Sequence, residues 1–246
     1  MSSILKKGVF IILFGIFSCA KNKENIIRKF SFNDGILSEY EYVIKDGDTI
    51  LHGKVNLFDI NGNEIGNGIY KNGKLNGEYI TYFKNGKFRE IRHYENDTIV
   101  GDRIYNFENG KIRKYIYHDK KGEVAFIVRF DEKGNVQSYE GHPLVDIEYF
   151  GVKDLNSLKI GDTLKYGYIL ANIPTAKSSL RIKLLDFDNS ITLRRIDSKR
   201  RNTIKVQELV VKKGKNSIRA ILKNEFNDSL KTSIVDSLRF DFLVEK

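Results

Sequence analysis

The sequence predicts a mostly β protein with an N-terminal signal helix, an elongated meander of stacked β-hairpin repeats and a β-sandwich after them. Three observations predict this order. A short apolar run opens the chain, glycines recur every 24 residues between positions 62 and 134, and short β-rich runs fill residues 158–246. The apolar fraction of 41%, with 13 Tyr and 16 Phe among 246 residues, is typical of a folded chain.

The first element is a secretory signal peptide over residues 1–18. Lys6 and Lys7 precede the almost wholly apolar segment 8–17, and the small residue Ser18 precedes Cys19. Ten apolar residues are too few to cross a bilayer, which needs about 20. The segment 16–19, Ile-Phe-Ser-Cys, resembles a bacterial lipobox, which implies cleavage before Cys19 and a diacylglycerol on its thiol. The alternatives are an ordinary cysteine near a cleavage site and an uncleaved signal anchor.

Residues 19–41 are then expected to hold the lipidated cysteine, a Lys- and Asn-rich tether over 20–29 and a first strand. Two or three acyl chains, which the resemblance implies, anchor a protein firmly, whereas one chain binds only marginally. Because Cys19 is the single cysteine, no disulfide is expected. We therefore expect a lipid-anchored protein of the cell envelope, in the bacterial outer membrane.

Residues 42–140 hold about four units of a repeat with a period of 24 residues. A fixed period in this range is typical of a stacked repeat architecture. Three ladders share the register: Gly62, Gly86, Gly110 and Gly134; then Gly53, Gly77 and Gly101, with Ala125 in the fourth place; then Tyr70, Tyr94 and His118.

Each unit has the pattern of a β-hairpin. Asn-Gly pairs end at Gly62, Gly86 and Gly110, each between two β-rich runs, and both positions of such a turn need positive φ. We therefore expect these glycines at hairpin tips. A lone hairpin is marginal in water, so neighbouring hairpins must bury a face together. The recurring Tyr and Phe residues are expected in the core, with a ligand-facing surface as the alternative.

The repeated pattern of Gly-x-x-x-x-aromatic, then Asn-Gly-Lys, then an aliphatic or aromatic residue resembles the MORN repeat in its bacterial, antitoxin-like variant, over residues 42–139. The resemblance implies a binding or scaffolding role without enzymatic activity. The tryptophan of eukaryotic units is missing from the repeats, and a His-Gly pair occurs there once, at His52-Gly53, so the phospholipid binding attributed to those residues is not implied. An exported lipoprotein would also be separated from a cytoplasmic toxin.

The segment 141–157 breaks the period and is expected to be a junction. The sandwich should occupy residues 158–246, because short runs with alternating polarity are separated there by turn signals. We expect strands at 163–171, 180–186, 203–211, 217–222 and 233–244. The segment 213–221 resembles the penultimate hairpin of immunoglobulin-like bacterial surface domains, which implies an immunoglobulin-like sandwich.

Positive charge is concentrated in the C-terminal part. Residues 151–246 carry 20 Lys and Arg against 11 Asp and Glu, whereas residues 20–150 carry 20 against 21. The densest cluster lies between two expected strands and comprises the candidate anion-binding residues Arg194, Arg195, Lys199, Arg200 and Arg201. Outside the cytoplasm their partner would be an anionic lipid or glycan, or an acidic envelope protein, rather than nucleic acid. The alternative is a solvated loop that protects a strand edge from aggregation.

We find no catalytic, cofactor-binding or metal-binding motif. The four histidines lack His-Glu-x-x-His spacing, and the segment that starts at Asp59 lacks the glycine and glutamate of a calcium loop, having Glu64 and Tyr70 there. The sequence therefore predicts a lipid-anchored, non-enzymatic envelope protein. The alternative is an envelope hydrolase, or an accessory domain of one, that acts on cell-wall or glycan material through carboxylates brought together by the fold.

Overall fold

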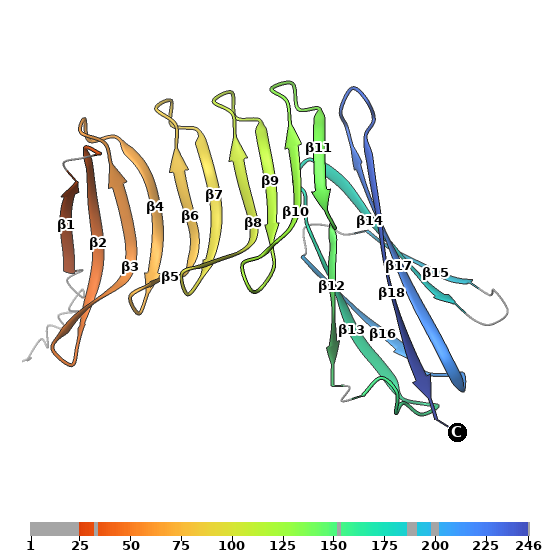
Figure 1. Ribbon diagram of the computed structural model, residues 1–246. Helices are drawn as coiled ribbons and strands as arrows, with labels where there is room; N and C mark the ends of the chain where they lie inside the picture. The colour runs from red at the N-terminus through yellow and green to blue at the C-terminus, as the bar shows by residue number, and fades with distance from the viewer. Residues whose placement is uncertain (1–24, 32–33, 152–153, 186–190, 198–201, 246) are drawn as a thin grey trace, which may run out of the picture.

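The computed structural model describes residues 25–31, 34–151, 154–185, 191–197 and 202–245, with the backbone alone at 185 and 191–197. Every element in this part of the chain is a β-strand, so the mostly β class is confirmed. Figure 1 shows a long row of hairpins that ends against a two-sheet unit. The predicted signal helix and Cys19 lie outside the described residues. No helix among the described residues is long and apolar enough to cross a membrane.

The repeats form one antiparallel sheet of 11 strands, in which neighbours in sequence are neighbours in space. Only β5 lies off this path, paired with β4. The strands are β1 (Asn25–Ser31), β2 (Ile36–Lys45), β3 (Asp48–Phe58), β4 (Glu64–Lys71), β5 (Lys74–Leu75), β6 (Gly77–Tyr82), β7 (Phe88–Glu95), β8 (Thr98–Asn106), β9 (Ile112–His118), β10 (Val124–Phe130) and β11 (Val136–Gly141). β1 begins at Asn25, within the segment that the sequence assigns to a tether.

The glycines of the first ladder lie at the hairpin tips with positive φ, as predicted. The expectation of positive φ at both turn positions is wrong, because Asn61, Asn85 and Asn109 before these glycines do not have positive φ. Gly62, Gly86 and Gly110 have φ of 82°, 78° and 91°, and the N–H of each donates to a carbonyl three residues earlier at 2.9 Å. Neighbouring tips are also bonded to each other. The side-chain amide of Asn85 donates to the Glu108 carbonyl at 3.1 Å, and Lys87 Nζ donates to the Asn109 carbonyl at 3.0 Å. The same two bonds recur one unit later, so the Asn-Gly-Lys sequence ties each hairpin to the next.

The residues of the second ladder are paired with those of the third ladder on neighbouring strands. The pairs are Gly53 with Tyr70, Gly77 with Tyr94, and Gly101 with His118. Each of these glycines lies within a strand at positive φ, from 68° to 113°. Glycine adopts positive φ without the strain that a side chain would cause, so these glycines permit the local bend. The period therefore encodes both the turns and the pairing between strands.

The C-terminal unit consists of two facing sheets. One has the order β12-β13-β16, and the other has the order β15-β14-β17-β18. Leu164, Tyr166 and Tyr168 from the first sheet and Leu180, Ile218 and Leu222 from the second form a continuous buried core between them. The strands are β12 (Leu144–Phe150), β13 (Thr163–Leu170), β14 (Ala176–Leu185), β15 (Ile191–Asp197), β16 (Thr203–Leu209), β17 (Gly214–Phe226) and β18 (Ser233–Val244).

Three elements here differ from the sequence prediction. The expected junction contains a full strand, β12, which pairs with β13 over Leu144–Phe150. β17 runs to 13 residues because it pairs along its length with both β14 and β18. β15 lies where a loop was expected. β12 and β15 pair with the strands next to them in the chain, β13 and β14, whereas the extra length of β17 matches its pairing with β14, which is distant in sequence.

The two units share a second hydrophobic core. Tyr115, Phe126 and Phe130 of the repeat sheet pack with Ile173 and Phe226 of the sandwich in one buried cluster. The rings of Phe130 and Phe226 are 5.9 Å apart, centre to centre. We call this contact the seam. Because the residues in it are buried, the sandwich is a packed continuation of the repeat sheet.

The row of hairpin tips continues across the seam. Asn135, in the last repeat tip, accepts hydrogen bonds from the N–H and hydroxyl of Ser229 at 3.0 and 2.8 Å. Asp228 accepts one from the N–H of Val136 at 3.2 Å. Ser229 and Asp228 belong to the loop between β17 and β18, which lies in line with the repeat tips in Figure 1.

Candidate anion-binding face

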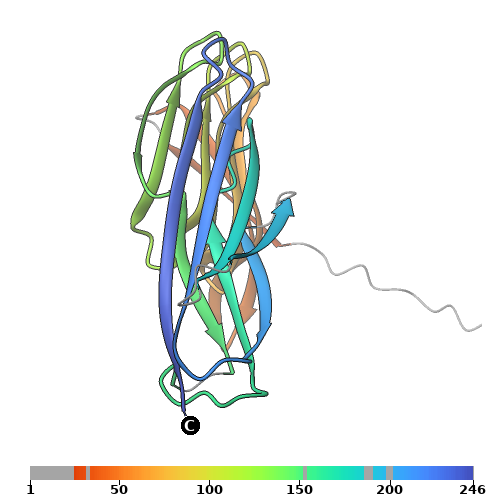
Figure 2. The same cartoon turned by 90° about the vertical axis from the view of Figure 1, so that its right-hand side faces the viewer.

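The outer face of the four-stranded sheet carries a concentration of positive charge. Along β14 and β17 the side chains alternate, so Ile182 and Ala220 are buried in the core whereas Arg181 and Arg219 are exposed on the other side. Figure 2 looks toward this sheet and shows β14, β17 and β18 in front of the repeat sheet. We call this surface the cationic face. Its described Lys and Arg residues are Lys177, Arg181, Lys183, Lys215, Arg219, Lys223 and Arg239.

Strand register places several of these cations side by side. Lys183 is paired with Arg219, and Arg219 with Arg239, so three cations occupy one row across three strands. Like charges directly opposite each other destabilise a sheet. An anion bound over the row would relieve that repulsion, and so the arrangement favours an anionic ligand.

Two carboxylates lie among the cations, and both already have partners. Asp241 accepts hydrogen bonds from Ser217 at 2.7 Å and Arg239 at 3.1 Å, and forms an ion pair with Lys215 at 3.0 Å. These contacts, first of all the Ser217 hydroxyl, lower the pKa of Asp241 to about 2. Glu225 pairs with Lys223 at 2.6 Å. Seven described cations against two carboxylates leave the face with a clear positive excess.

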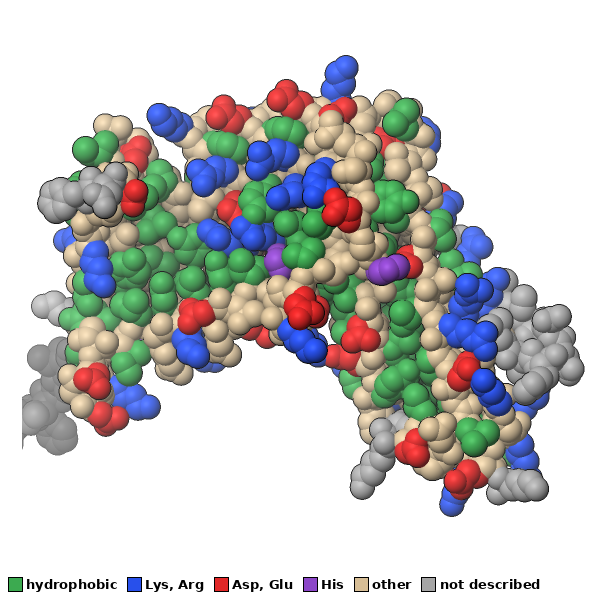
Figure 3. All heavy atoms as spheres, viewed as in Figure 1, with side chains coloured by type: hydrophobic (Ala, Val, Ile, Leu, Met, Phe, Trp, Pro, Cys, Tyr) green, Lys and Arg blue, Asp and Glu red, His purple; other side chains and the backbone are tan. Residues whose placement is uncertain are grey.

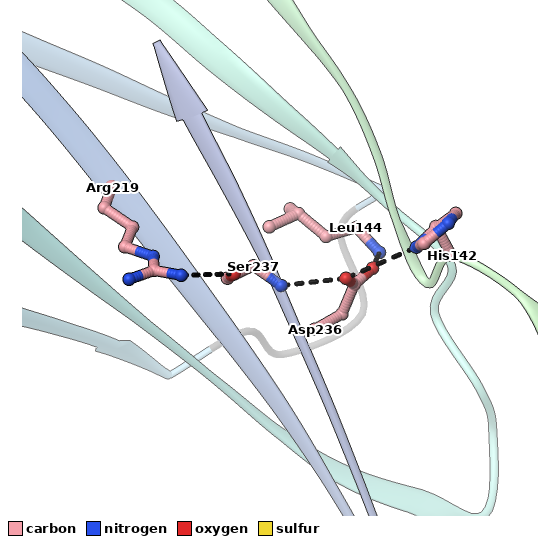
Figure 4. Close-up of polar contacts among 5 residues, drawn as sticks. All are labelled: His142, Leu144, Arg219, Asp236 and Ser237. Carbon is pink, nitrogen blue, oxygen red and sulfur yellow. Dashed lines mark hydrogen bonds and ion pairs between the residues drawn. The ribbon is translucent and has the colours of Figure 1, made fainter.

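Arg219 is held near the centre of the face by a polar chain (Figure 4). Its guanidinium donates to the Ser237 hydroxyl at 3.3 Å, and the Ser237 N–H donates to Asp236 at 2.8 Å. Asp236 also accepts from the Leu144 N–H at 3.1 Å and contacts His142 Nδ1 at 3.4 Å. The chain therefore links β17 and β18 to the start of β12. Within the described residues, Arg219 forms no ion pair with a carboxylate.

The structure divides the predicted anion-binding cluster. Arg194 and Arg195 lie in β15, an edge strand of the same sheet, in register with Ile182 and Arg181. Their side chains, and the whole of Lys199, Arg200 and Arg201, lie outside what is described. The seven cations of the sheet itself are not among the site residues predicted from the sequence. Their signal was alternation with apolar residues, as in the segment 180–183, Leu-Arg-Ile-Lys, which spreads the charge over several strands instead of forming a run.

A second charged area lies on the repeat sheet, where Figure 3 shows Lys and Arg side chains gathered over the central strands. Buried Glu90 pairs with Arg103 at 2.8 Å. The ring of Tyr105 has Arg103 at 4.9 Å and Lys114 at 4.4 Å from its centre. Burial, together with the neighbouring arginines, lowers the pKa of Lys114. The mixture of signs makes this area weaker than the cationic face as a site for anions.

A cavity of about 550 Å³ lies in the angle between the repeat sheet and the sandwich, lined by His93, Asp102, Tyr117 and Asn202 among others. Burial raises the pKa of Asp102, and hydrogen bonds from Tyr115, at 2.6 Å, and from Asn202 oppose that rise. Asp102 therefore links the two units.

Within the described ranges, no group of three or more His, Cys, Asp or Glu side chains could hold a metal ion. Asp59, which begins the segment compared with a calcium loop, accepts the N–H groups of Asn61 and Asn63 through its Oδ1 atom and so closes its own turn.

Comparison with known proteins identifies no relative. No protein-family model matches the chain, and no curated protein matches it. Among solved structures, a crystal structure of a TarM mutant from S. aureus, in complex with Fondaparinux, alpha-GlcNAc-glycerol and UDP, shares 15% sequence identity at a TM-score of 0.26. The match covers 40% of this chain and 18% of that chain. A likeness this slight identifies neither a fold family nor a function.

Proposed function

We propose that this chain is a lipid-anchored, non-enzymatic protein of the bacterial envelope, most consistent with the outer membrane, that binds an anionic partner through the cationic face. The observation that carries the proposal is the row formed by Lys183, Arg219 and Arg239, which face one another in register on an open sheet. The signal segment and Cys19 supply the anchoring part of the proposal.

In this proposal the repeats have a scaffolding role and are of the bacterial MORN-variant type. The tip bonds from Asn85 and Lys87 give the Asn-Gly-Lys sequence a structural purpose, which supports that assignment. We also propose an immunoglobulin-like sandwich. The hairpin of β17 and β18 contains the segment 213–221 on which that resemblance rests, and its pairing within a two-sheet unit supports it.

The binding part is tested with residues 20–246 and fluorescent polygalacturonate, a polymer of carboxylates. Each basic residue contributes about 1 kcal/mol near an anionic surface. Replacing Arg181 and Arg219 with Gln should therefore weaken binding about 30-fold at low salt, since 1.4 kcal/mol is tenfold. Replacing the exposed repeat-sheet residues Lys54 and Lys71 with Gln is the matched control and should leave affinity unchanged. Equal losses in both variants would contradict a specific face.

The anchoring part is tested by metabolic palmitate labelling and membrane fractionation of the full chain. Cys19→Ala should abolish labelling and release the protein from the membrane fraction. A Cys19→Ala protein that still incorporates label and stays with the membrane would refute lipid anchoring at this residue.

The alternative of an envelope hydrolase draws on one observation. The raised pKa of Asp102, in a cavity that His93 also lines, is a property of general acids. Against this reading, both Tyr115 and Asn202 donate to the same carboxylate. Hydrolysis of cell-wall glycan by the purified protein, abolished by Asp102→Asn, would favour the alternative.

A further inference from the structure

The cationic face and the proposed lipid anchor are at opposite ends of the molecule. Figure 1 shows β1 at one end of the hairpin row and the four-stranded sheet at the other. Figure 2, viewed from the sandwich end, shows β14, β17 and β18 broadside, so the cationic face points away from β1. Nine inter-strand steps of about 4.8 Å separate β1 from β11, or about 43 Å along the sheet.

The sandwich is fixed in this direction by its contacts with the repeats. The seam buries Phe126 and Phe130 of the repeat sheet against Phe226, and Asn135 is bonded to Ser229 across it. A buried apolar contact resists hinge motion, in contrast to a small polar interface between domains. The cationic face cannot turn back toward β1 without breaking this core.

The chain between the lipid and the sheet is short. Six residue steps separate Cys19 from Asn25, and a fully extended chain spans at most about 3.6 Å per residue, or about 22 Å. Laying the cationic face flat on a membrane would lift β1 about 43 Å, plus the thickness of the sandwich, above that membrane. The tether covers less than half of that height.

We infer that the anionic partner of the cationic face is a polymer located away from the anchoring membrane, such as a carboxylate-bearing wall glycan, and not the head groups of the lipids in which Cys19 is anchored. This inference rests on the proposed function. The repeat sheet then serves as a rigid spacer that holds the binding face at a fixed distance. The tether is too short for the cationic face to reach the head groups of the anchoring membrane. A polymer located near the sandwich end of the molecule can reach that face.

The test compares the lipidated full chain in vesicles with the soluble residues 20–246. Val235→Cys, at a position of β18 that is 61% exposed and lies outside the polar chain of Arg219, gives both proteins one site for a donor dye, because lipid occupies Cys19 in the anchored form. Vesicles contain anionic lipid and an acceptor dye. At low salt the soluble protein should show strong energy transfer to the vesicles. The anchored protein should show weak transfer and should capture polygalacturonate from solution, equally well on neutral vesicles.

Two variants sharpen the comparison. Arg181→Gln with Arg219→Gln should reduce capture by the anchored protein about 30-fold, and Lys54→Gln with Lys71→Gln should not change it. Deleting residues 77–100, one repeat unit that contains β6 and β7, should bring the donor about 10 Å closer to the vesicle and raise energy transfer without loss of capture.

Energy transfer as strong in the anchored protein as in the soluble one would overturn the inference, because the face would then reach its own membrane. So would failure of the anchored protein to capture a polymer that the soluble protein binds. If the soluble protein bound neither vesicles nor polymer, the proposed function would fall, and this inference with it.

Discussion

The seam predicts that the repeats and the sandwich unfold as one unit, and Phe226→Ala is the sharpest perturbation of it. Phe226 is 5% exposed, and its ring is 5.9 Å from that of Phe130 on β10. Replacing a buried Phe with Ala costs about 3–5 kcal/mol, because the transfer free energy is lost and a cavity remains. Typical domains are stable by about 5–15 kcal/mol, so this loss is a large share of the total.

The assay is urea unfolding of residues 20–246, followed by hydrogen exchange of individual peptides. The wild type should unfold in a single transition, and Phe226→Ala should lower its midpoint with little change in slope. Amides of β9 and β10 should lose protection as much as those of β17, although the substitution is in the sandwich. Phe88→Ala is the control, because Phe88 is 48% exposed and should cost much less.

Two results would refute this reasoning. A wild-type protein that unfolds in two separate transitions would show that the seam does not couple the units. Unchanged protection of β9 and β10 in Phe226→Ala would show that the repeat sheet does not depend on the sandwich.

Two further predictions concern the tips and the buried carboxylate. Gly86→Val should cost about 1 kcal/mol or more in the free energy of unfolding, because φ is 78° there, and an unchanged thermal midpoint would contradict the tip assignment. Asp102 has a pKa raised by burial, so its ionised form disfavours the folded state. Its contribution to stability should fall as pH rises from the unfolded value of 3.8 through the folded pKa. Asp102→Asn should therefore gain stability relative to the wild type over that window, as measured by unfolding at several pH values; a difference independent of pH would contradict the shift.

The sequence by itself determined the repeat sheet. Gly86 and its equivalents encode tight turns through a local requirement for positive φ, and consecutive strands then pair with their neighbours in the chain. The same period also contains the contact of Gly77 with Tyr94, although spacing alone does not show that the two ladders face each other. Such a fold can be predicted from composition and spacing, because its turns depend on local geometry and its short loops bring consecutive strands together.

The tertiary structure alone decided the seam and the cationic face. Phe130 and Phe226 meet although 96 positions separate them. Lys183, Arg219 and Arg239 form one row because β17 pairs in this register both with β18, the next strand in the chain, and with β14, which is distant in sequence. No local pattern fixes such contacts, since register in a sandwich follows from which residues share a buried face. The sequence located the positive charge in the C-terminal part, and the folded sheet concentrated it on one surface.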